Sequence, residues 1–207
     1  MTMNEVLTQA DHQRLRETIR EAERQTSGEI FVVIARASGD YSLWGVLWAA
    51  VMALLIPWPI QFFGWLAMPW PLVAQALCFV TAASIFIMPR VLVRLVPAAI
   101  RRTNTRQAAL EQFLAHGIHT TAARTGVLIY VSLLEHAVEV IADAGIHDLA
   151  GQDCWQQAVE LVRGEARDGH LALGLEKAIL SVGATLAHHW PVGHGDRNEL
   201  ADRVVVL

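Results

Sequence analysis

The hydrophobic positions of this chain change their spacing from segment to segment, and the spacing predicts alternating helices and strands. In residues 8–27, Leu15, Ile19 and Ala22 fall on one helical face behind a Thr-x-x-Asp capping box. Residues 29–35 form a short, mostly apolar run rich in β-branched side chains, which is typical of a buried strand.

Further along the chain, residues 103–117 return to helical spacing and end at a glycine. Two strand-like runs, 126–132 and 136–142, follow with only three residues between them, which is the spacing of a hairpin. Helical patterns over 154–168 and 174–188 complete the series.

This order of elements predicts an α/β fold. A strand, a helical crossover and another strand favour a parallel pair, and the tight turn after it adds an antiparallel strand. Helices then cover both faces of the sheet. We therefore expect an αβα sandwich with a small mixed sheet.

One long segment does not fit a water-soluble fold. The 49 residues from Tyr41 to Pro89 include no charged side chain. A crossing helix needs roughly 20 apolar residues, so this stretch is long enough for two crossings and a turn. Prolines in the run PWPIQFFGWLAMPWP mark the turn. The pattern predicts an inserted two-helix transmembrane hairpin, with helices over 43–66 and 72–95, or a shallower re-entrant hairpin if Pro57 and Pro59 stop the first helix.

Arginines give the hairpin an orientation. The turn has no Lys or Arg, whereas Arg36 precedes the apolar stretch and a run of arginines follows it: Arg90, Arg94, Arg101, Arg102 and Arg106. By the positive-inside rule both flanks and both termini face the cytoplasm, and the arginine run is interpreted as a lipid-headgroup anchor. Residues 1–40 and 97–195 are then one discontinuous cytoplasmic domain, 41–96 the hairpin and 196–207 a C-terminal tail.

Charge and cysteine content exclude several classes of protein. The formal net charge is -4, so the chain lacks the basic field that nucleic-acid binding requires. Cys78 and Cys154 are too far apart for a CxxC metal site or a disulfide framework. Neither Gly-x-Ser-x-Gly nor a phosphate-binding loop sequence occurs. The residues by themselves predict no cofactor.

Three segments together resemble a known family. TSGEIFVVIA, RTGVLIYVSLLEHAVEVIADAGI and GHLALGLEKAILSVGATLAHHWP follow one another in the order found in the TPM domain. The chain is similar to the bacterial membrane-protein branch of that family, in which a hydrophobic hairpin interrupts the domain. The resemblance implies an αβα sandwich and a place in the bacterial inner membrane.

The resemblance also implies candidate functions. TPM domains are associated with repair or assembly of membrane complexes, with acid phosphatase activity and with divalent metals, often calcium. The acidic triplet that usually opens the central strand corresponds here to Arg124-Thr125-Gly126, and an arginine repels a cation. We therefore expect an interaction or regulatory module with the lipid bilayer and a membrane protein as partners. The alternative is a membrane-tethered phosphatase or metal-dependent hydrolase.

Two groups of polar residues are candidate sites. Strand directions place Glu29, Arg124 and Asp143 at one end of the sheet, where they could bind an oxyanion or a metal, or where the arginine could simply bridge two carboxylates. Asp40 and Glu135 lie with Ser132 at the opposite end, and two carboxylates there could act as acid and base. The candidate catalytic residues are thus Asp40, Glu135 and Asp143, and the candidate metal ligands are Glu29 and Asp143.

Histidines near the C-terminus also invite a zinc interpretation. His188, His189 and His194 lie in the sequence HHWPVGH. Adjacent helical side chains project in different directions, so the favoured interpretation is a helix end rather than a metal site.

Overall fold

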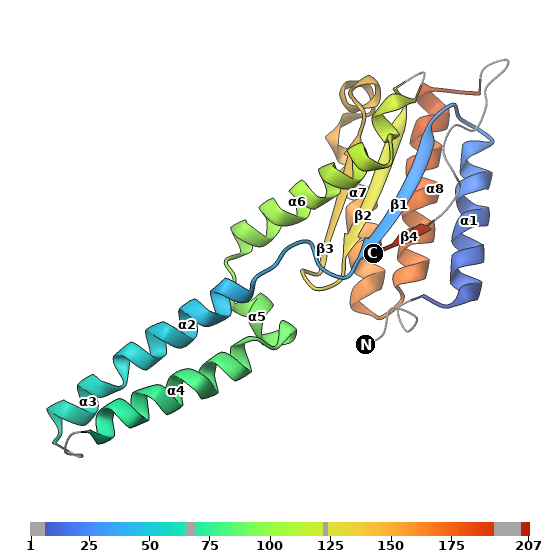
Figure 1. The fold of residues 1–207 in the computed structure, drawn as a ribbon. Helices are drawn as coiled ribbons and strands as arrows, with labels where there is room; N and C mark the ends of the chain where they lie inside the picture. Colours follow the sequence, from blue (N-terminus) through green and yellow to red (C-terminus); the bar gives the residue numbers. More distant parts are fainter. Residues whose placement is uncertain (1–6, 65–68, 122–123, 193–203) are drawn as a thin grey trace. The chain divides into compact units, whose positions relative to one another are not determined.

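The computed structural model describes residues 7–64, 69–121, 124–192 and 204–207. The chain divides into two compact units (Figure 1). Unit 1 comprises residues 1–38 and 103–207, and unit 2 comprises residues 39–102. The fold is mixed α/β, as the order of elements predicts.

The sheet of unit 1 has four strands in the order β3-β2-β1-β4. Strands β1 (Glu29–Ala35) and β2 (Gly126–Ser132) pair in parallel, and β2 pairs antiparallel with β3 (Ala137–Ala142). Both pairings confirm the sequence prediction. The fourth strand, β4 (Val204–Val206), pairs in parallel with β1, so these residues belong to the sheet and not to the polar tail expected from the sequence.

Helices pack on both faces of this sheet (Figure 1). Helices α1 (Gln9–Glu23), α7 (Ala144–Arg167) and α8 (Leu171–His189) share one apolar core with the even-numbered residues of β1, among them Val32. On the other face, Ala109 and Phe113 of α6 (Ala98–Ala115) pack against the odd-numbered residues of β1. Both strands β1 and β2 are buried along their whole length, as central parallel strands require.

Two of the helices that pack on the sheet begin earlier than their patterns predict. Helix α7 starts at Ala144 and not near residue 154, because the Asp143 side chain accepts a hydrogen bond from the Ala144 backbone N–H and starts the helix directly after β3. At Gly151 (φ 72°) the helix is kinked. Helix α6 starts at Ala98, one residue after Pro97, and not at Thr103.

Unit 2 is helical: α2 (Ser42–Leu55), α3 (Pro57–Phe62), α4 (Trp70–Phe86) and α5 (Pro89–Leu95). Ile56 has helical dihedral angles, so Pro57 continues the first helix instead of stopping it. The expected helix over 72–95 is not continuous. It bends by 101° between α4 and α5, because a proline disfavours a helical conformation in the residue before it and Met88 is accordingly extended.

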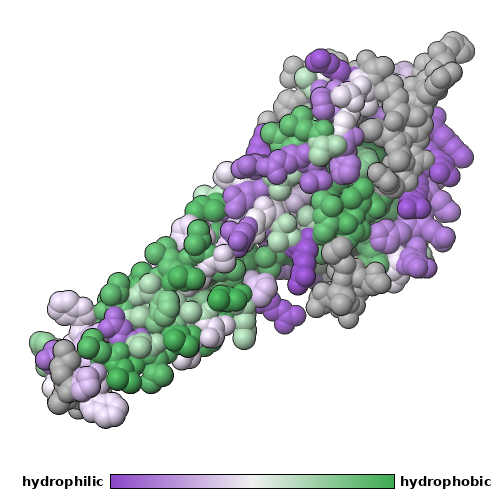
Figure 2. Space-filling view, viewed as in Figure 1, coloured by the Kyte–Doolittle hydropathy of each residue, from purple (hydrophilic) through white to green (hydrophobic). Residues whose placement is uncertain are grey.

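The surface of unit 2 is largely apolar (Figure 2). The buried positions of α2 are the small residues Gly45, Ala49 and Ala53, and large side chains such as Leu43 (80% exposed) and Leu54 (63%) face outward. Among the described residues, Ser42–Phe62 and Leu171–His189 are long and apolar enough to cross a membrane, and α4 with α5 would count as a third if the bent pair is one span.

Candidate functional site

A buried polar cluster lies where β1 and β2 end. It consists of Ser38, Tyr130, Ser132 and Glu135, and Ser132 and Tyr130 are each 1% exposed. Because side chains alternate along a strand, Tyr130 and Ser132 stand on the same face of β2, the face that α6 covers. The hairpin turn after β2 then brings Glu135 back to the strand end, where the Leu133 and Leu134 N–H groups donate to the carbonyls of Ala35 and Arg36.

Hydrogen bonds connect the cluster into one chain. The Ser38 hydroxyl donates to Ser132 Oγ (2.7 Å), and Ser132 in turn donates to Glu135 Oε2. A serine hydroxyl has a single proton, so Tyr130 must be the donor in its 3.0 Å contact with Ser38 Oγ. The chain of donors therefore runs from Tyr130 through both serines to the carboxylate.

The carboxylate also fixes the backbone that leaves β1. Glu135 Oε1 accepts the Ser38 backbone N–H at 2.9 Å, so a single side chain accepts from both the strand end and the segment that follows it. Burial raises the pKa of Tyr130 against the opposing effect of its hydrogen bond with Ser38, and the nearby Glu135 and Glu111 carboxylates raise this pKa further. The tyrosine thus stays protonated and remains a donor at neutral pH.

This geometry is better suited to fixing the backbone at the end of the sheet than to catalysis. Glu135 is placed to take the proton of Ser132, which is what activation of a nucleophile needs. At 1% exposure, however, the Ser132 hydroxyl is out of reach of a substrate in this conformation. The cluster as it stands fastens residues 36–38 to the end of the sheet.

The structure only partly brings together the residues expected at this end. Ser132 and Glu135 share the end of the sheet where they were expected and are in contact, whereas Asp40 belongs to unit 2. Asp40 is exposed, and its side chain accepts the Ser42 backbone N–H at 2.9 Å at the start of α2. The hydrogen bonds from Ser42 lower the pKa of Asp40, so it is a charged group at a helix start.

At the opposite end of the sheet, Glu29 of β1 and Gly126 of β2 lie in one row with Asp143, which directly follows β3. Glu29 is the register partner of Gly126, and the Asp143 N–H donates to the Gly126 carbonyl. Glu29 (7% exposed) and Asp143 (8%) are both buried. Gly126 stands between them in the row, and Ile118 lies directly over Gly126.

A calcium ion needs more ligands than the described residues of this row supply. Calcium takes six to eight oxygen ligands, and the described part of the chain contains no group of three or more His, Cys, Asp or Glu side chains placed to hold a metal. Asp143 Oδ1 is already used by the Ala144 N–H, although its buried Oδ2 has no hydrogen-bond partner. Arg124 is exposed in a left-handed conformation (φ 51°) and, within the described residues, forms no ion pair with either carboxylate.

His188 and His189 lie at the end of a helix, which is the favoured interpretation of their sequence. His188 and His189 are exposed in the last turn of α8, and their rings contact each other in an edge-on arrangement (4.7 Å). His194 lies outside the described residues.

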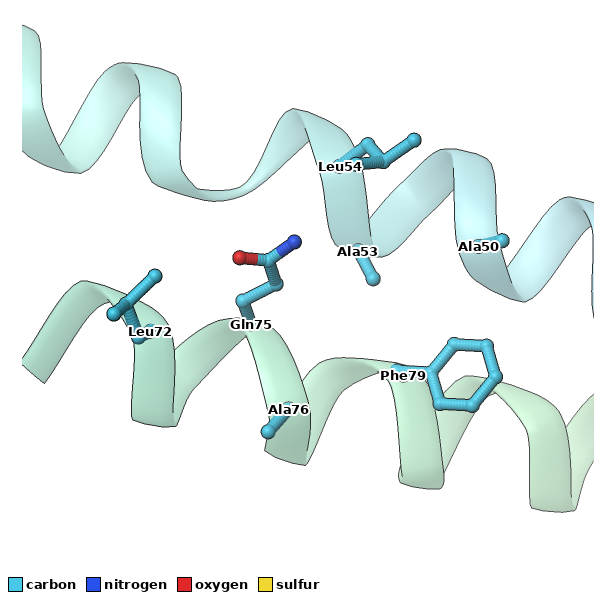
Figure 3. A pocket seen from close by; sticks show the side chains of 7 residues that line it. All are labelled: Ala50, Ala53, Leu54, Leu72, Gln75, Ala76 and Phe79. Atoms are coloured by element: carbon cyan, nitrogen blue, oxygen red, sulfur yellow. The ribbon is translucent and has the colours of Figure 1, made fainter.

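Unit 2 contains a cavity of its own. A space of about 430 Å³ opens between α2 and α4, lined by Leu54, Leu72 and Phe79 with three alanines, and by one polar side chain, Gln75. Figure 3 shows the Gln75 amide extending from α4 toward α2. An apolar groove of this kind is suited to a hydrocarbon chain or a helix.

Two members of the buried cluster, Ser38 and Tyr130, were not expected from the sequence. Tyr130 stands two residues before Ser132 in a buried strand, and this spacing is the signal that could have placed it on the same face. Ser38 has no such signal, because its position depends on how the chain leaves β1.

Comparison with known proteins adds information on the fold. No family model matches the chain, and no curated protein matches it. Among solved structures, the chain is similar to the NMR structure of BA42 protein from the psychrophilic bacterium Bizionia argentinensis. The alignment has 19% identity and a TM-score of 0.64, and it covers 100% of this chain and 99% of that chain. At this identity the similarity supports the fold alone.

Proposed function

We propose that this chain is a membrane-anchored interaction or regulatory module. In this proposal unit 2 is a transmembrane hairpin, and unit 1 is a cytoplasmic αβα domain of the TPM type that acts on membrane protein complexes of the bacterial inner membrane. The observation that carries the proposal is the apolar surface of unit 2, because exposing so large an apolar surface to water is unfavourable.

The lengths of the helices are consistent with a bilayer. Ser42–Phe62 has 21 residues and a mean hydropathy of 1.9. At 1.5 Å per residue it extends about 31 Å, close to the roughly 30 Å hydrocarbon core. Because its buried residues are small, it contacts α4 closely and leaves its large side chains for lipid.

The other long apolar helix, α8, has a different role. Its mean hydropathy is lower, 1.2, and its apolar face is buried against the sheet of unit 1. Leu175, Ile179 and Val182 all lie in that core. We therefore assign α8 to the folded domain and only the hairpin to the membrane.

Unit 1 has features of a docking domain. Its buried polar cluster holds a backbone segment, and two leucines one turn apart on α6, Leu110 (48% exposed) and Leu114 (51%), remain at the surface. An apolar pair of this kind is suited to contact with a protein partner. The resemblance to TPM domains supports the same role, whereas the similarity to BA42 protein bears on the fold alone.

The test is membrane retention of the full chain in cells, with topology reporters fused to each terminus. We expect the chain to resist alkaline extraction and both reporters to read as cytoplasmic. Leu47→Arg combined with Leu77→Arg places charges on exposed positions of α2 and α4 and should release the chain, because an arginine inside the hydrocarbon core costs up to about 3 kcal/mol.

The matched control is Leu110→Arg with Leu114→Arg, which makes the same change at similarly exposed leucines of unit 1. This control should remain in the membrane fraction. Release of the unaltered chain by alkaline extraction, or equal release of both variants, would contradict the proposal.

A second candidate function follows from the Ser132–Glu135 contact, which is the arrangement of a hydroxyl and its base. If the domain opens, the chain could act as a membrane-tethered phosphatase or hydrolase. Turnover of p-nitrophenyl phosphate by the full chain, lost in Glu135→Gln and Asp143→Asn, would favour it. A partner that co-purifies in the absence of turnover would favour the interaction module.

A further inference from the structure

The bend after α4 makes α5 an unusual element of the hairpin. Helix α5 runs at 101° to α4, so if α4 follows the bilayer normal, α5 lies close to the membrane plane. It is also firmly attached to α2. Leu92 contacts the position where a Gly45 side chain would begin, and the Trp48 indole N–H donates to the Leu95 carbonyl at 3.2 Å.

Two arginines occupy the outward side of this short helix. Arg90 and Arg94 are four residues apart, hence one helical turn, and both are exposed. Within the described residues neither forms an ion pair with a carboxylate. The sequence offers few local candidates, because no Asp or Glu occurs from Tyr41 to Leu110.

Exposed apolar side chains directly precede this pair in the sequence. Ile87 (56% exposed) and Met88 (57%) stand exposed at the bend directly before α5, whereas Leu92 and Val93 are buried beneath it. Cations next to outward apolar side chains, on an element that lies flat, are the signature of a helix at the lipid–water interface.

We propose that α5 binds the phosphate group of an anionic phospholipid through Arg90 and Arg94. A guanidinium donates two hydrogen bonds in a plane, a geometry that fits phosphate oxygens. A lipid is favoured over free phosphate because Ile87 and Met88 lie beside the cations, where the start of an acyl chain would pack. The proposal rests on the hairpin being in the membrane and adds a preference for the charge of the headgroup.

The experiment uses the purified full chain in an uncharged detergent, titrated with phosphatidylglycerol or with phosphatidylcholine and read by native mass spectrometry. Two cations at an anionic surface are together worth about 30-fold in binding. We expect the unaltered chain to prefer phosphatidylglycerol by roughly 10- to 30-fold and the Arg90→Gln, Arg94→Gln variant to lose most of this preference.

The control is Arg14→Gln with Arg16→Gln, which removes the same charge from exposed positions of α1. It should keep the preference. The proposal is overturned if the α5 variant keeps the preference, if the control loses it equally, or if millimolar inorganic phosphate displaces the lipid. Binding of both lipids without preference would refute this inference alone, whereas binding of neither lipid, in a chain that stays in solution without detergent, would refute the membrane anchor.

Discussion

Gly126 shows how one missing side chain determines the packing of the sheet. A Cβ atom at this position would lie 2.5 Å from both the carbonyl oxygen and a side-chain carbon of Ile118. Backbone cannot move aside as a flexible side-chain tip can, so the requirement for glycine is steric.

We predict that Gly126→Ala destabilises unit 1 by about 1–3 kcal/mol through overpacking. Gly164→Ala is the control, because a Cβ at that position in α7 meets no atom within 4 Å. The control should be neutral or stabilising by up to about 1 kcal/mol, since alanine favours helix. Thermal unfolding of both variants in the same detergent measures the difference, and equal melting temperatures would refute the argument.

Glu135 is the residue on which the buried cluster depends. Glu135→Ala leaves the Ser132 hydroxyl and the Ser38 N–H without their acceptor, which we expect to cost about 2 kcal/mol. The melting temperature should then fall by roughly 4–8 °C. Glu135→Gln keeps an acceptor oxygen and should lose less. A melting temperature unchanged in Glu135→Ala would show that the cluster contributes nothing to stability.

The sequence predicted part of this site because its residues follow strand geometry. Ser132 and Glu135 are three residues apart across a tight turn, so their proximity could be inferred from the hairpin. Ser38 could not be assigned, because its position depends on a hydrogen bond with Glu135, 97 residues away. Glu29 and Asp143 share one end of the sheet, as predicted, but the close packing of Ile118 on Gly126 could not be anticipated from local patterns.

At the scale of elements, the start of α1 is a complete capping box. The Asp11 N–H donates to Thr8 Oγ1 (3.1 Å), and Asp11 Oδ2 accepts from the Thr8 hydroxyl (2.7 Å) and N–H (2.9 Å). These hydrogen bonds from the Thr8 side chain and backbone lower the pKa of Asp11 from its usual 3.8. A lowered pKa stabilises the folded state above pH 4, and this contribution is lost as the pH falls through the folded-state pKa.

We predict that Thr8→Ala raises the pKa of Asp11 toward its usual value and costs about 1 kcal/mol of stability at neutral pH. Thr8→Ser keeps the hydroxyl and should change neither quantity much. An NMR titration of the Asp11 carboxyl measures the pKa in all three proteins. An unchanged Asp11 pKa in Thr8→Ala would mean that the capping box does not form in solution.

Other element boundaries show where sequence patterns are informative and where they are not. Strands β1 and β2 and their parallel pairing followed from apolar runs and connection rules. The break before Pro89 was missed because hydrophobicity continues through it, although the restriction on the residue before a proline was available as a signal. The short β4 was missed because three valines are too few for a pattern, and only pairing with β1 makes them a strand.

On the scale of the whole molecule, the proposed membrane anchor and the folded α/β domain are separate compact units. Replacing residues 39–102 by a flexible linker should leave unit 1 with its core intact, since the apolar clusters of both sheet faces lie outside that segment. We predict that this shortened chain is monomeric and water-soluble without detergent. Size-exclusion chromatography and circular dichroism measure this, and an aggregated or unfolded product would mean that unit 1 depends on the hairpin.

The parallel pairing of β1 with β2 has a consequence for biosynthesis. Glu29 must pair with Gly126, and the whole hairpin is made between these two residues. At a synthesis rate of about 5–20 residues per second, β2 leaves the ribosome several seconds after β1. If unit 2 enters the membrane as proposed, its insertion precedes closure of the sheet. A chain whose hairpin fails to insert would hold β1 exposed beside an aggregation-prone apolar segment, which makes it an early target for quality-control proteases.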